Sequence, residues 1–227
     1  MLALDKRLRT CADMVSADGI VCDVATDHAL LPAYLVQNGI KHVIASDINE
    51  GPLKSAENTL KKYEIAHENV TLIQSDGLDN VPSDGVSDVI IAGVGAELII
   101  NILDRADWVK NNVNLILQPM THTPALRKWL YNHGYEIVEE RAAVCDRFVY
   151  AVIKARYCGA CCDVDDTFSY LGMIDPTAFA GRKYAKKQIL RLEKAIEQIR
   201  KSNPLDPRAE HFSSVVRGIT ERLGKSV

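Results

Sequence analysis

Two short apolar runs near the start of the chain end in acidic side chains. The first begins at Ile20 and carries Asp23, Asp27 and His28, and the second ends in Asp47. Adjacent parallel strands of a nucleotide-binding α/β sheet present acids to a ligand in this way, at their carboxyl ends. A dinucleotide-binding domain would place a G-x-G-x-x-G turn after the first strand. The glycine-free, acidic turn found here instead suits a ligand without phosphate and with a positive charge, and S-adenosylmethionine meets that description.

Three successive strand ends carry an acid. Asp23 ends the first strand, where an acid in this type of fold organises the loop or meets the amino group of the methionine moiety. Asp47 is placed to accept two hydrogen bonds from ribose hydroxyls, and Asp76, followed by Gly77, to accept one from the adenine amino group. Each acid alone has an ordinary structural interpretation, as a helix cap or a turn residue. Three in series are much less frequent by accident, so the set favours a nucleoside site, and we expect Ile48 to belong to it.

The fourth and fifth predicted strands end in residues that suit a flat ligand. Gly93 and Gly95 follow the fourth strand, where the missing side chains leave room for a base and the sulfonium methyl group. A tight turn between strand and helix is the structural alternative. Gln118 ends the fifth strand, where its amide would pair with a base edge or simply fix the turn.

Strand-like and helix-like runs alternate up to residue 155. An amphipathic helix over residues 4–16 comes first. We expect strands at residues 20–24, 42–47, 70–74, 86–92, 113–117, 135–141 and 148–155, with helices at 30–38, 51–63, 97–105 and 123–133. This alternation predicts an α/β fold, with a parallel sheet covered by helices on both faces. The connection 142–147 is too short for a parallel crossover, so the last two strands should form an antiparallel hairpin. That ending is typical of the seven-stranded, Rossmann-like sheet of class I methyltransferases.

The rest of the chain has a different pattern and charge. Residues 179–199 and 207–223 have the spacing of two long helices, which predicts an antiparallel, coiled-coil-like hairpin. From Pro176 onward, 12 Lys and Arg residues stand against 5 Asp and Glu, a net charge of +7, whereas the first 175 residues carry −10. A basic hairpin on an acidic body suggests a polyanionic partner, although a solvated helical face has the same composition. We expect a catalytic domain at 1–160 and a hairpin for docking at 161–227.

Composition bounds the class of protein. A chain of 227 residues, 47% hydrophobic and 25% charged, is typical of soluble globular proteins. The longest apolar runs are strand-length and the N-terminus lacks a signal-peptide pattern, so we expect a cytoplasmic protein that does not enter a membrane. Its six cysteines are then expected as reduced thiols. Cys158, Cys161 and Cys162 lack the second pair of ligands that a structural zinc site needs, so we expect no metal.

Several motifs together resemble one family. They are D-V-A-T-D-H-A-L-L-P from Asp23, A-S-D-I-N-E-G-P-L-K-S-A from Ala45, Asp76-Gly77, I-A-G-V-G-A from Ile91, L-I-L-Q-P-M from Leu115 and the Leu-Arg-Lys-Trp-Leu segment around Trp129. This set resembles the bacterial tRNA (adenine(22)-N(1))-methyltransferases, which pair a class I methyltransferase domain with a C-terminal helical hairpin. The resemblance covers nearly the whole chain. It implies S-adenosylmethionine as cofactor and tRNA as partner. The residues it places at the cofactor are Asp23, Ala25, Asp27, His28, Asp47, Ile48, Asp76, Gly77, Gly93 and Gly95.

The implied reaction is methyl transfer to ring nitrogen N1 of an adenine in tRNA. Because N1 carries a lone pair and no proton at neutral pH, alignment and electrostatics should supply most of the catalysis. The base would be extruded from a paired region, and Asp27 or His28 would hold its edge or accept its amino proton. Substrate contacts are expected from Gln118 and from basic side chains of the first helix and the hairpin: Lys6, Arg7, Arg9, Lys183, Lys186, Lys187 and Arg191.

Two residues depart from the family pattern. Ala25 and Ala96 stand where the family usually has glycine. Alanine tolerates positive φ poorly, so each replacement matters only if the backbone shape requires glycine. Weaker cofactor affinity or a slightly different target would be the consequence.

Two other functions remain open on the sequence. One is a methyltransferase for a small molecule or a protein, with the hairpin used for dimerisation. The other is a cofactor-binding interaction module that has lost catalysis. The oligomeric state is open as well, and a monomer is compatible with the pattern.

Overall fold

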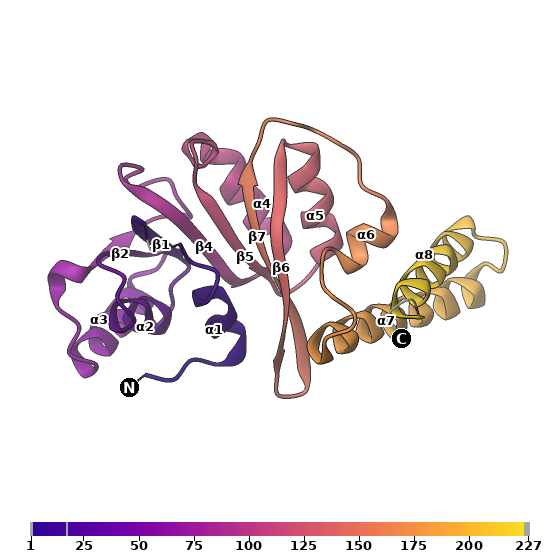
Figure 1. The fold of residues 1–227 in the computed structure, drawn as a ribbon, viewed down its shortest axis with the longest axis horizontal. Coiled ribbons are helices and arrows are strands. Elements are labelled where there is room, and N and C mark those ends of the chain that lie inside the picture. The colour runs from indigo at the N-terminus through magenta and orange to yellow at the C-terminus, as the bar shows by residue number, and fades with distance from the viewer. Residues whose placement is uncertain (1, 17, 225–227) are drawn as a thin grey trace.

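A seven-stranded sheet forms the centre of the protein (Figure 1). The computed structural model describes residues 2–16 and 18–224. Its strands are β1 (Ile20–Val24), β2 (Val43–Asp47), β3 (Val70–Gln74), β4 (Val86–Val94), β5 (Asn114–Pro119), β6 (Tyr135–Cys145) and β7 (Phe148–Tyr157), in the order β3-β2-β1-β4-β5-β7-β6. Because the strand order reverses between β1 and β4, a crevice opens at the carboxyl ends of these strands.

The last two strands form the predicted antiparallel hairpin. β7 runs antiparallel to both of its neighbours, β5 and β6. The strands are longer than the sequence pattern predicts and leave only residues 146 and 147 between them. The predicted connection 142–147 is therefore mostly strand. Ala142 and Val144 of the added part pack against the core that the C-terminal helices form, and this tertiary contact supports the longer strands.

Helices cover both faces of the sheet. They are α1 (Lys6–Ala12), α2 (Leu30–Gln37), α3 (Glu50–Lys62), α4 (Ala96–Arg105) and α5 (Thr123–Asn132), with single 3-10 turns at His67–Asn69 and Asp107–Lys110. Helices α1, α2 and α3 share one core, and α4 and α5 share the other. Ile90 faces the first core and Ile91 the second. Since successive side chains of a strand point to opposite faces, the near-continuous apolar strands fill both cores.

The first helix is shorter than the predicted span of residues 4–16. It begins after Asp5, whose carboxylate caps it by accepting a hydrogen bond from the Leu8 amide at 2.8 Å, and it ends at Ala12. Beyond the helix, the Met14 carbonyl accepts a hydrogen bond from Lys154 Nζ at 2.8 Å. This contact with β7 takes the place of another helical turn.

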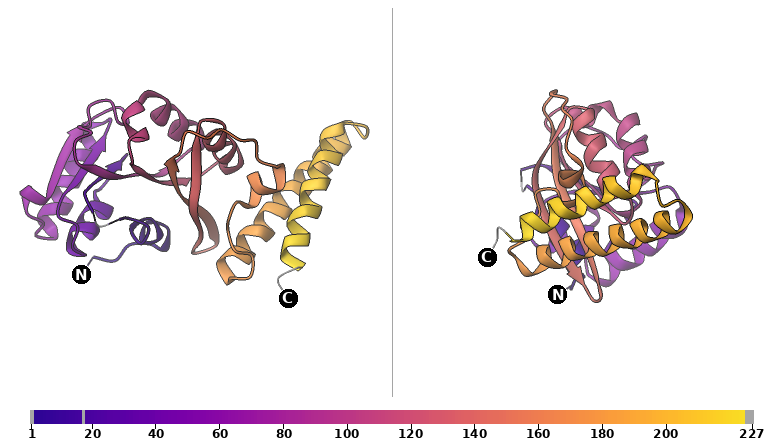
Figure 2. Two further views of the ribbon diagram at one scale, coloured as in Figure 1. Left: turned by 45° about the horizontal axis from the view of Figure 1, so that its top comes forward. Right: turned by 90° about the vertical axis from the view of Figure 1, so that its right-hand side faces the viewer.

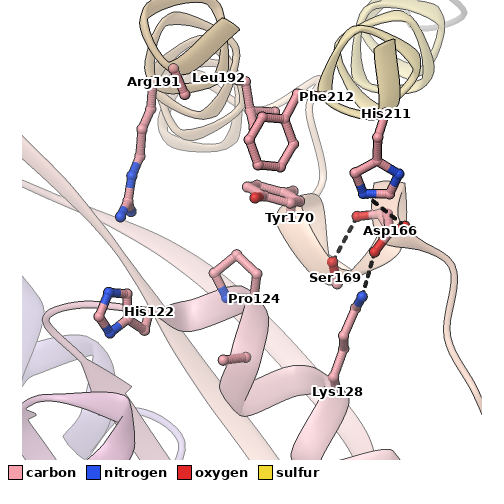
Figure 3. Close-up of a pocket in the computed structure, with 12 residues that line it drawn as sticks. His122, Pro124, Lys128, Asp166, Ser169, Tyr170, Arg191, Leu192, His211 and Phe212 are labelled. Atoms are coloured by element: carbon pink, nitrogen blue, oxygen red, sulfur yellow. Dashed lines mark hydrogen bonds and ion pairs between the residues drawn. The ribbon is translucent and has the colours of Figure 1, made fainter. Parts of the chain in front are cut away.

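Three helices follow the sheet. They are α6 (Asp166–Leu171), α7 (Phe179–Ser202) and α8 (Pro207–Gly224). Helices α7 and α8 form the predicted hairpin at the β6 end of the molecule (Figure 2), packed around a third, smaller core. The sequence pattern does not predict α6, because six residues are too few to show helical periodicity. A cavity of about 500 Å³ lies between α5, α6 and the hairpin (Figure 3). None of the described helices is both long and apolar enough to cross a membrane.

A fully buried ion pair joins the sheet domain to the C-terminal helices. Arg127 of α5 donates to Glu140 of β6 from Nε at 2.9 Å and from Nη2 at 2.8 Å. The same guanidinium donates to the carbonyls of Ser169 and Tyr170 in α6, at 2.7 and 3.0 Å. Gly172 follows α6 at φ +65°, and a Cβ there would lie 1.8 Å from Glu140 Oε2. The pair therefore fixes the end of α6 at the sheet.

The turn after β1 has an unusual backbone. Ala25, Asp27 and Ala29 have φ angles of 57°, 53° and 50°, in the left-handed region. This region costs a residue with a side chain roughly 1–2 kcal/mol. Ala96, in contrast, begins α4 with ordinary helical geometry. Of the two alanines that replace a family glycine, only Ala25 is strained.

We expect Ala25→Gly to raise the free energy of unfolding by about 0.5–1 kcal/mol, because relief of the left-handed strain exceeds the added freedom of the unfolded chain. Urea denaturation measures the change. The matched variant Ala96→Gly should lower stability by about 1 kcal/mol, since it removes a buried methyl group at the start of α4 and adds freedom to the unfolded chain. If Ala25→Gly lowered the free energy of unfolding, the inference that Ala25 is strained would be wrong.

We expect Arg127→Met to lower the free energy of unfolding by about 3–5 kcal/mol, since it leaves Glu140 buried without its partner. The double variant Arg127→Met/Glu140→Leu should recover part of that loss, because no uncompensated charge remains. Guanidinium denaturation of both variants tests this. A loss below about 1 kcal/mol in the single variant would show that the pair does not hold the junction.

Candidate functional site

A cavity of about 390 Å³ opens at the carboxyl ends of β1, β2 and β4. Residues expected at the cofactor line much of it: Asp23, Ala25, Asp27, His28, Asp47 and Gly93. Apolar side chains complete the wall, with Leu30 and Leu31 from α2 and Ala92 and Val94 from β4. The crevice created by the reversal of strand order thus gathers side chains from three strands.

Asp23 is the most buried acid of this cavity. The residue is 4% exposed, and its Oδ2 accepts a hydrogen bond from Thr26 Oγ1 at 2.7 Å. Burial raises the pKa of Asp23 to about 7; the bond from Thr26 opposes the shift and the charge of Asp47 adds to it. Thr26 is not among the expected site residues, although its position three residues after Asp23 is a signal for such a bond. A carboxylate held at this cost gains most from a cationic ligand.

Asp47 is also buried, at the end of β2. Its Oδ1 accepts a hydrogen bond from the Asn49 amide at 3.0 Å. Among the residues that the structure describes, no side chain donates to this carboxylate. The second carboxylate oxygen, Oδ2, is therefore available to accept a hydrogen bond from a ligand hydroxyl.

Asp27 and His28 lie at the mouth of the cavity. Their side chains are 71% and 57% exposed, and His28 Nε2 lies 3.5 Å from Asp27 Oδ1. Both side chains can reach a molecule that approaches from solvent. Their catalytic role stays a prediction.

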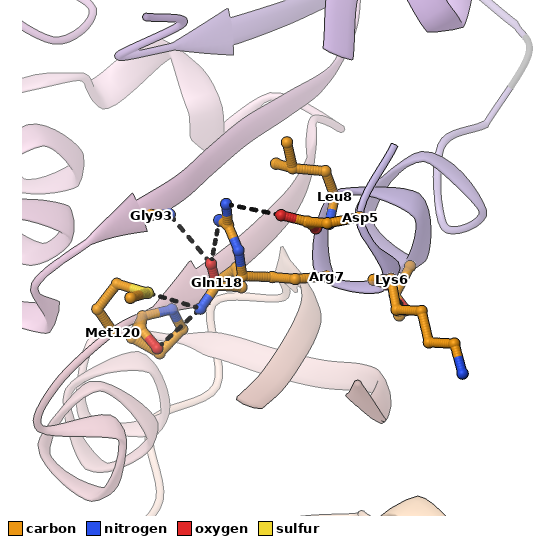
Figure 4. Close-up of polar contacts among 9 residues, drawn as sticks. Asp5, Lys6, Arg7, Leu8, Gly93, Gln118 and Met120 are labelled. Atoms are coloured by element: carbon orange, nitrogen blue, oxygen red, sulfur yellow. Dashed lines mark hydrogen bonds and ion pairs between the residues drawn. The ribbon is translucent and has the colours of Figure 1, made fainter. Parts of the chain in front are cut away.

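Arg7 of α1 reaches into the same cavity, where Gln118 holds it (Figure 4). Gln118 Oε1 accepts from Arg7 Nη1 at 2.7 Å and from the Gly93 amide at 3.1 Å, and Gln118 Nε2 donates to the Pro119 carbonyl at 3.0 Å. Gly93 has φ +84°, and a Cβ there would lie 3.3 Å from Arg7 Nη1. Arg7 thus faces this cavity, and the buried Gln118 amide is bonded within the protein. The expected contacts of both residues with the substrate stay predictions.

Four residues expected at the cofactor do not line the cavity: Ile48, Asp76, Gly77 and Gly95. Asp76 pairs with Arg105 of α4 at 3.1 Å, and this hydrogen bond lowers the pKa of Asp76. Gly77 has φ +60°, and a Cβ there would lie 2.7 Å from Ile102. A contact between α4 and the loop after β3 therefore accounts for both residues, and their role at the adenine stays a prediction.

The basic residues expected to bind RNA differ in their surroundings. Arg9 pairs with Asp13 at 2.8 Å, whereas the Lys6 side chain extends away from the cavity (Figure 4). On α7, Lys183 and Lys186 are exposed. Lys187 is exposed as well, but its Nζ donates to the Val149 carbonyl at 2.7 Å, and partial burial of the amine lowers its pKa. Sequence position alone could not separate these cases.

Free thiols account for the six cysteines. Within residues 2–16 and 18–224, no group of three or more His, Cys, Asp or Glu side chains could hold a metal ion. The candidate site is thus defined by three carboxylates, a guanidinium and an imidazole around the cavity.

Known proteins are similar to this chain in sequence and in fold. The family model of the methyltransferase domain matches residues 4–153. Over 156 residues the chain is 34% identical to the tRNA (adenine(22)-N(1))-methyltransferase of Bacillus subtilis strain 168, and the alignment covers 68% of this chain and 65% of that protein. The crystal structure of the B. subtilis m1A22 tRNA methyltransferase TrmK matches with a TM-score of 0.79 at 26% identity, over 98% of this chain and 100% of that one.

A second solved structure is TrmK of M. capricolum in complex with S-adenosyl-homocysteine. It matches with a TM-score of 0.80 at 26% identity, over 97% of this chain and 98% of that one. The structural matches include the C-terminal hairpin, and the family match covers more than half of the chain. The chain belongs to the methyltransferase-domain family, and over about two thirds of its length it is similar to a tRNA (adenine(22)-N(1))-methyltransferase.

Proposed function

We propose that this protein transfers a methyl group from S-adenosylmethionine to N1 of an adenine in tRNA, at the position 22 type of site, in the cytoplasm. One observation carries the proposal: Asp23, Asp47 and Arg7 line one cavity at the carboxyl edge of the sheet, in a chain of this family. A ligand with an ammonium group, a carboxylate and a ribose matches these groups one to one.

The cavity residues fit this cofactor by charge. Asp23 would accept from the ammonium group, and the pairing would relieve the cost of its burial. Arg7, held by Gln118, would pair with the carboxylate, and Asp47 would accept from the ribose hydroxyls. When bound, the cofactor supplies an electrophilic methyl group on a cationic sulfur.

The protein's part in the reaction is then alignment. Adenine N1 attacks through its own lone pair, so no side chain has to remove a proton from it first. Asp27 and His28, exposed at the cavity mouth, would hold the edge of the extruded base. After transfer the ring is cationic, and the nearby Asp27 carboxylate would stabilise that charge or accept a proton from the amino group.

Mass spectrometry of tRNA nucleosides tests the function. Unmodified tRNA incubated with the protein and S-adenosylmethionine should gain 1-methyladenosine. Asp47→Ala should reduce both cofactor affinity and methylation by roughly tenfold or more, because it removes the ribose contacts. Methyl transfer to a protein or small molecule, with tRNA left unmodified, would support the alternative enzyme. Cofactor binding without transfer would support the interaction module.

We expect cofactor affinity to rise with pH as Asp23 ionises. With a pKa of about 7 in the free protein, affinity should be roughly five- to tenfold tighter at pH 7.5 than at pH 6. Titration calorimetry at both pH values measures this. Asp23→Asn should remove the dependence, and the matched variant Asp18→Asn, outside the cavity, should keep it. A flat profile for the unaltered protein would exclude Asp23 as the partner of the ammonium group.

The raised pKa of Asp23 also determines the direction in which the free energy of unfolding changes with pH. The folded protein holds a proton on Asp23 at pH values where the unfolded chain does not, between about 4 and 7. The contribution of Asp23 to the free energy of unfolding of the cofactor-free protein therefore falls as pH rises through this window.

A further inference from the structure

A second cavity lies where the methyltransferase domain meets the hairpin. This junction cavity, the one between α5, α6 and the hairpin, has a volume of about 500 Å³, which is ordinary for a ligand site. It shares no lining residue with the cofactor cavity. Lys128 of α5, Tyr170 of α6, Arg191 of α7 and Phe212 of α8 all contribute to it (Figure 3). The proposed cofactor chemistry leaves this cavity without a role.

The charges of the junction cavity fall into two groups. Lys128 and His211 both pair with Asp166, which ties α5, α6 and α8 together. Arg191 reaches from α7 toward His122 on the other side (Figure 3). Within the described part of the chain, the guanidinium of Arg191 makes no hydrogen bond or ion pair. A free guanidinium at the rim of a cavity suits a phosphodiester, with which it can form two parallel hydrogen bonds.

Two aromatic rings lie in the middle of the junction cavity. Tyr170 and Phe212 are half-buried, and both line it between the two charged groups (Figure 3). Pro124 and Leu192 add apolar surface. Aromatic faces beside a cation accept any nucleic acid base by stacking, whatever its sequence.

A narrow recess continues the junction cavity toward the loop after β5. The two share His122, Pro124 and Arg191, and the recess has a volume of about 20 Å³. Gln188 lines the recess, and its buried Oε1 has no hydrogen-bond partner within the described residues. The space fits a single donor group. A ribose 2′-hydroxyl is such a donor, and it distinguishes RNA from DNA.

We propose that the junction cavity binds one unpaired nucleotide of the substrate RNA, distinct from the adenine that is methylated. The base stacks on Tyr170 and Phe212, and Arg191 binds a neighbouring phosphate. This inference rests on the proposed function. It assigns a defined pocket to the basic hairpin, so that the domain and the hairpin grip the RNA together, and the methylated base enters a separate cavity.

Binding of an unmodified tRNA transcript, followed by fluorescence anisotropy, tests the pocket. Phe212→Leu keeps the apolar contacts of the third core but removes the aromatic face, and it should weaken tRNA binding about tenfold. Phe212→Tyr should stay within about twofold of the unaltered protein. Arg191→Ala should weaken binding and reduce the slope of log Kd against log salt by about 1. The control Arg200→Ala, on the same helix but outside the cavity, should leave the slope unchanged.

Cofactor affinity and thermal unfolding of each variant separate a local effect from misfolding, and both should remain unchanged. Equal losses in Arg191→Ala and Arg200→Ala would overturn the pocket in favour of diffuse charge on the hairpin. If the unaltered protein methylates tRNA while Phe212→Leu and Arg191→Ala bind tRNA as it does, only this inference fails. If the unaltered protein neither binds nor methylates tRNA, the proposed function fails and this inference with it.

Discussion

The placement of the C-terminal half of the protein depends on one buried ion pair. Arg127 and Glu140 have no exposed side-chain surface, and charges at such depth are tolerable only when every hydrogen bond is made. The Arg127 guanidinium meets this demand with two carbonyls of α6 and the Tyr184 hydroxyl of α7. Glu140 Oε2 accepts from the Met173 amide at 2.7 Å. A pair that is satisfied only by the following helices obliges those helices to take one position, and that position creates the junction cavity.

The acids of the candidate cofactor cavity, unlike the buried ion pair, are not fully satisfied by protein groups. The charge that would satisfy them therefore has to come from a ligand. Among the described residues, the hydroxyl of Thr26 is the one side chain that donates to the buried Asp23. Arg7, the basic residue of this cavity, does have a protein partner, because it donates a hydrogen bond to Gln118 Oε1 that orients its guanidinium. The left-handed turn at Ala25 and Asp27 adds backbone strain at the same place, as is common where a loop is shaped for a ligand.

Much of the architecture was predictable, because a clear apolar period in the sequence indicates both the type of element and the face that is buried. β1 and β3 have the predicted bounds, and the antiparallel ending was expected from the shortness of its connection. The errors lie where a local pattern is weak or tertiary contacts override it. α6 is too short to show helical periodicity. α1 ends early, where Lys154 of β7 bonds the Met14 carbonyl just beyond it. The hairpin strands extend because the third core covers them.

The sequence by itself determined the order of elements, the acids at the strand ends and the charge of the hairpin, since these follow from residue type and spacing. Only the tertiary structure decided what each side chain faces. It turned Arg7 into the cavity at the carboxyl edge of the sheet and bonded Lys187 to the Val149 carbonyl. It paired Asp76 with Arg105 and, among the residues that the structure describes, left the Arg191 guanidinium without a hydrogen bond or ion pair. The physical reason is that a charge is used according to its nearest partner and its exposure to water, and both are set by residues far away in the chain.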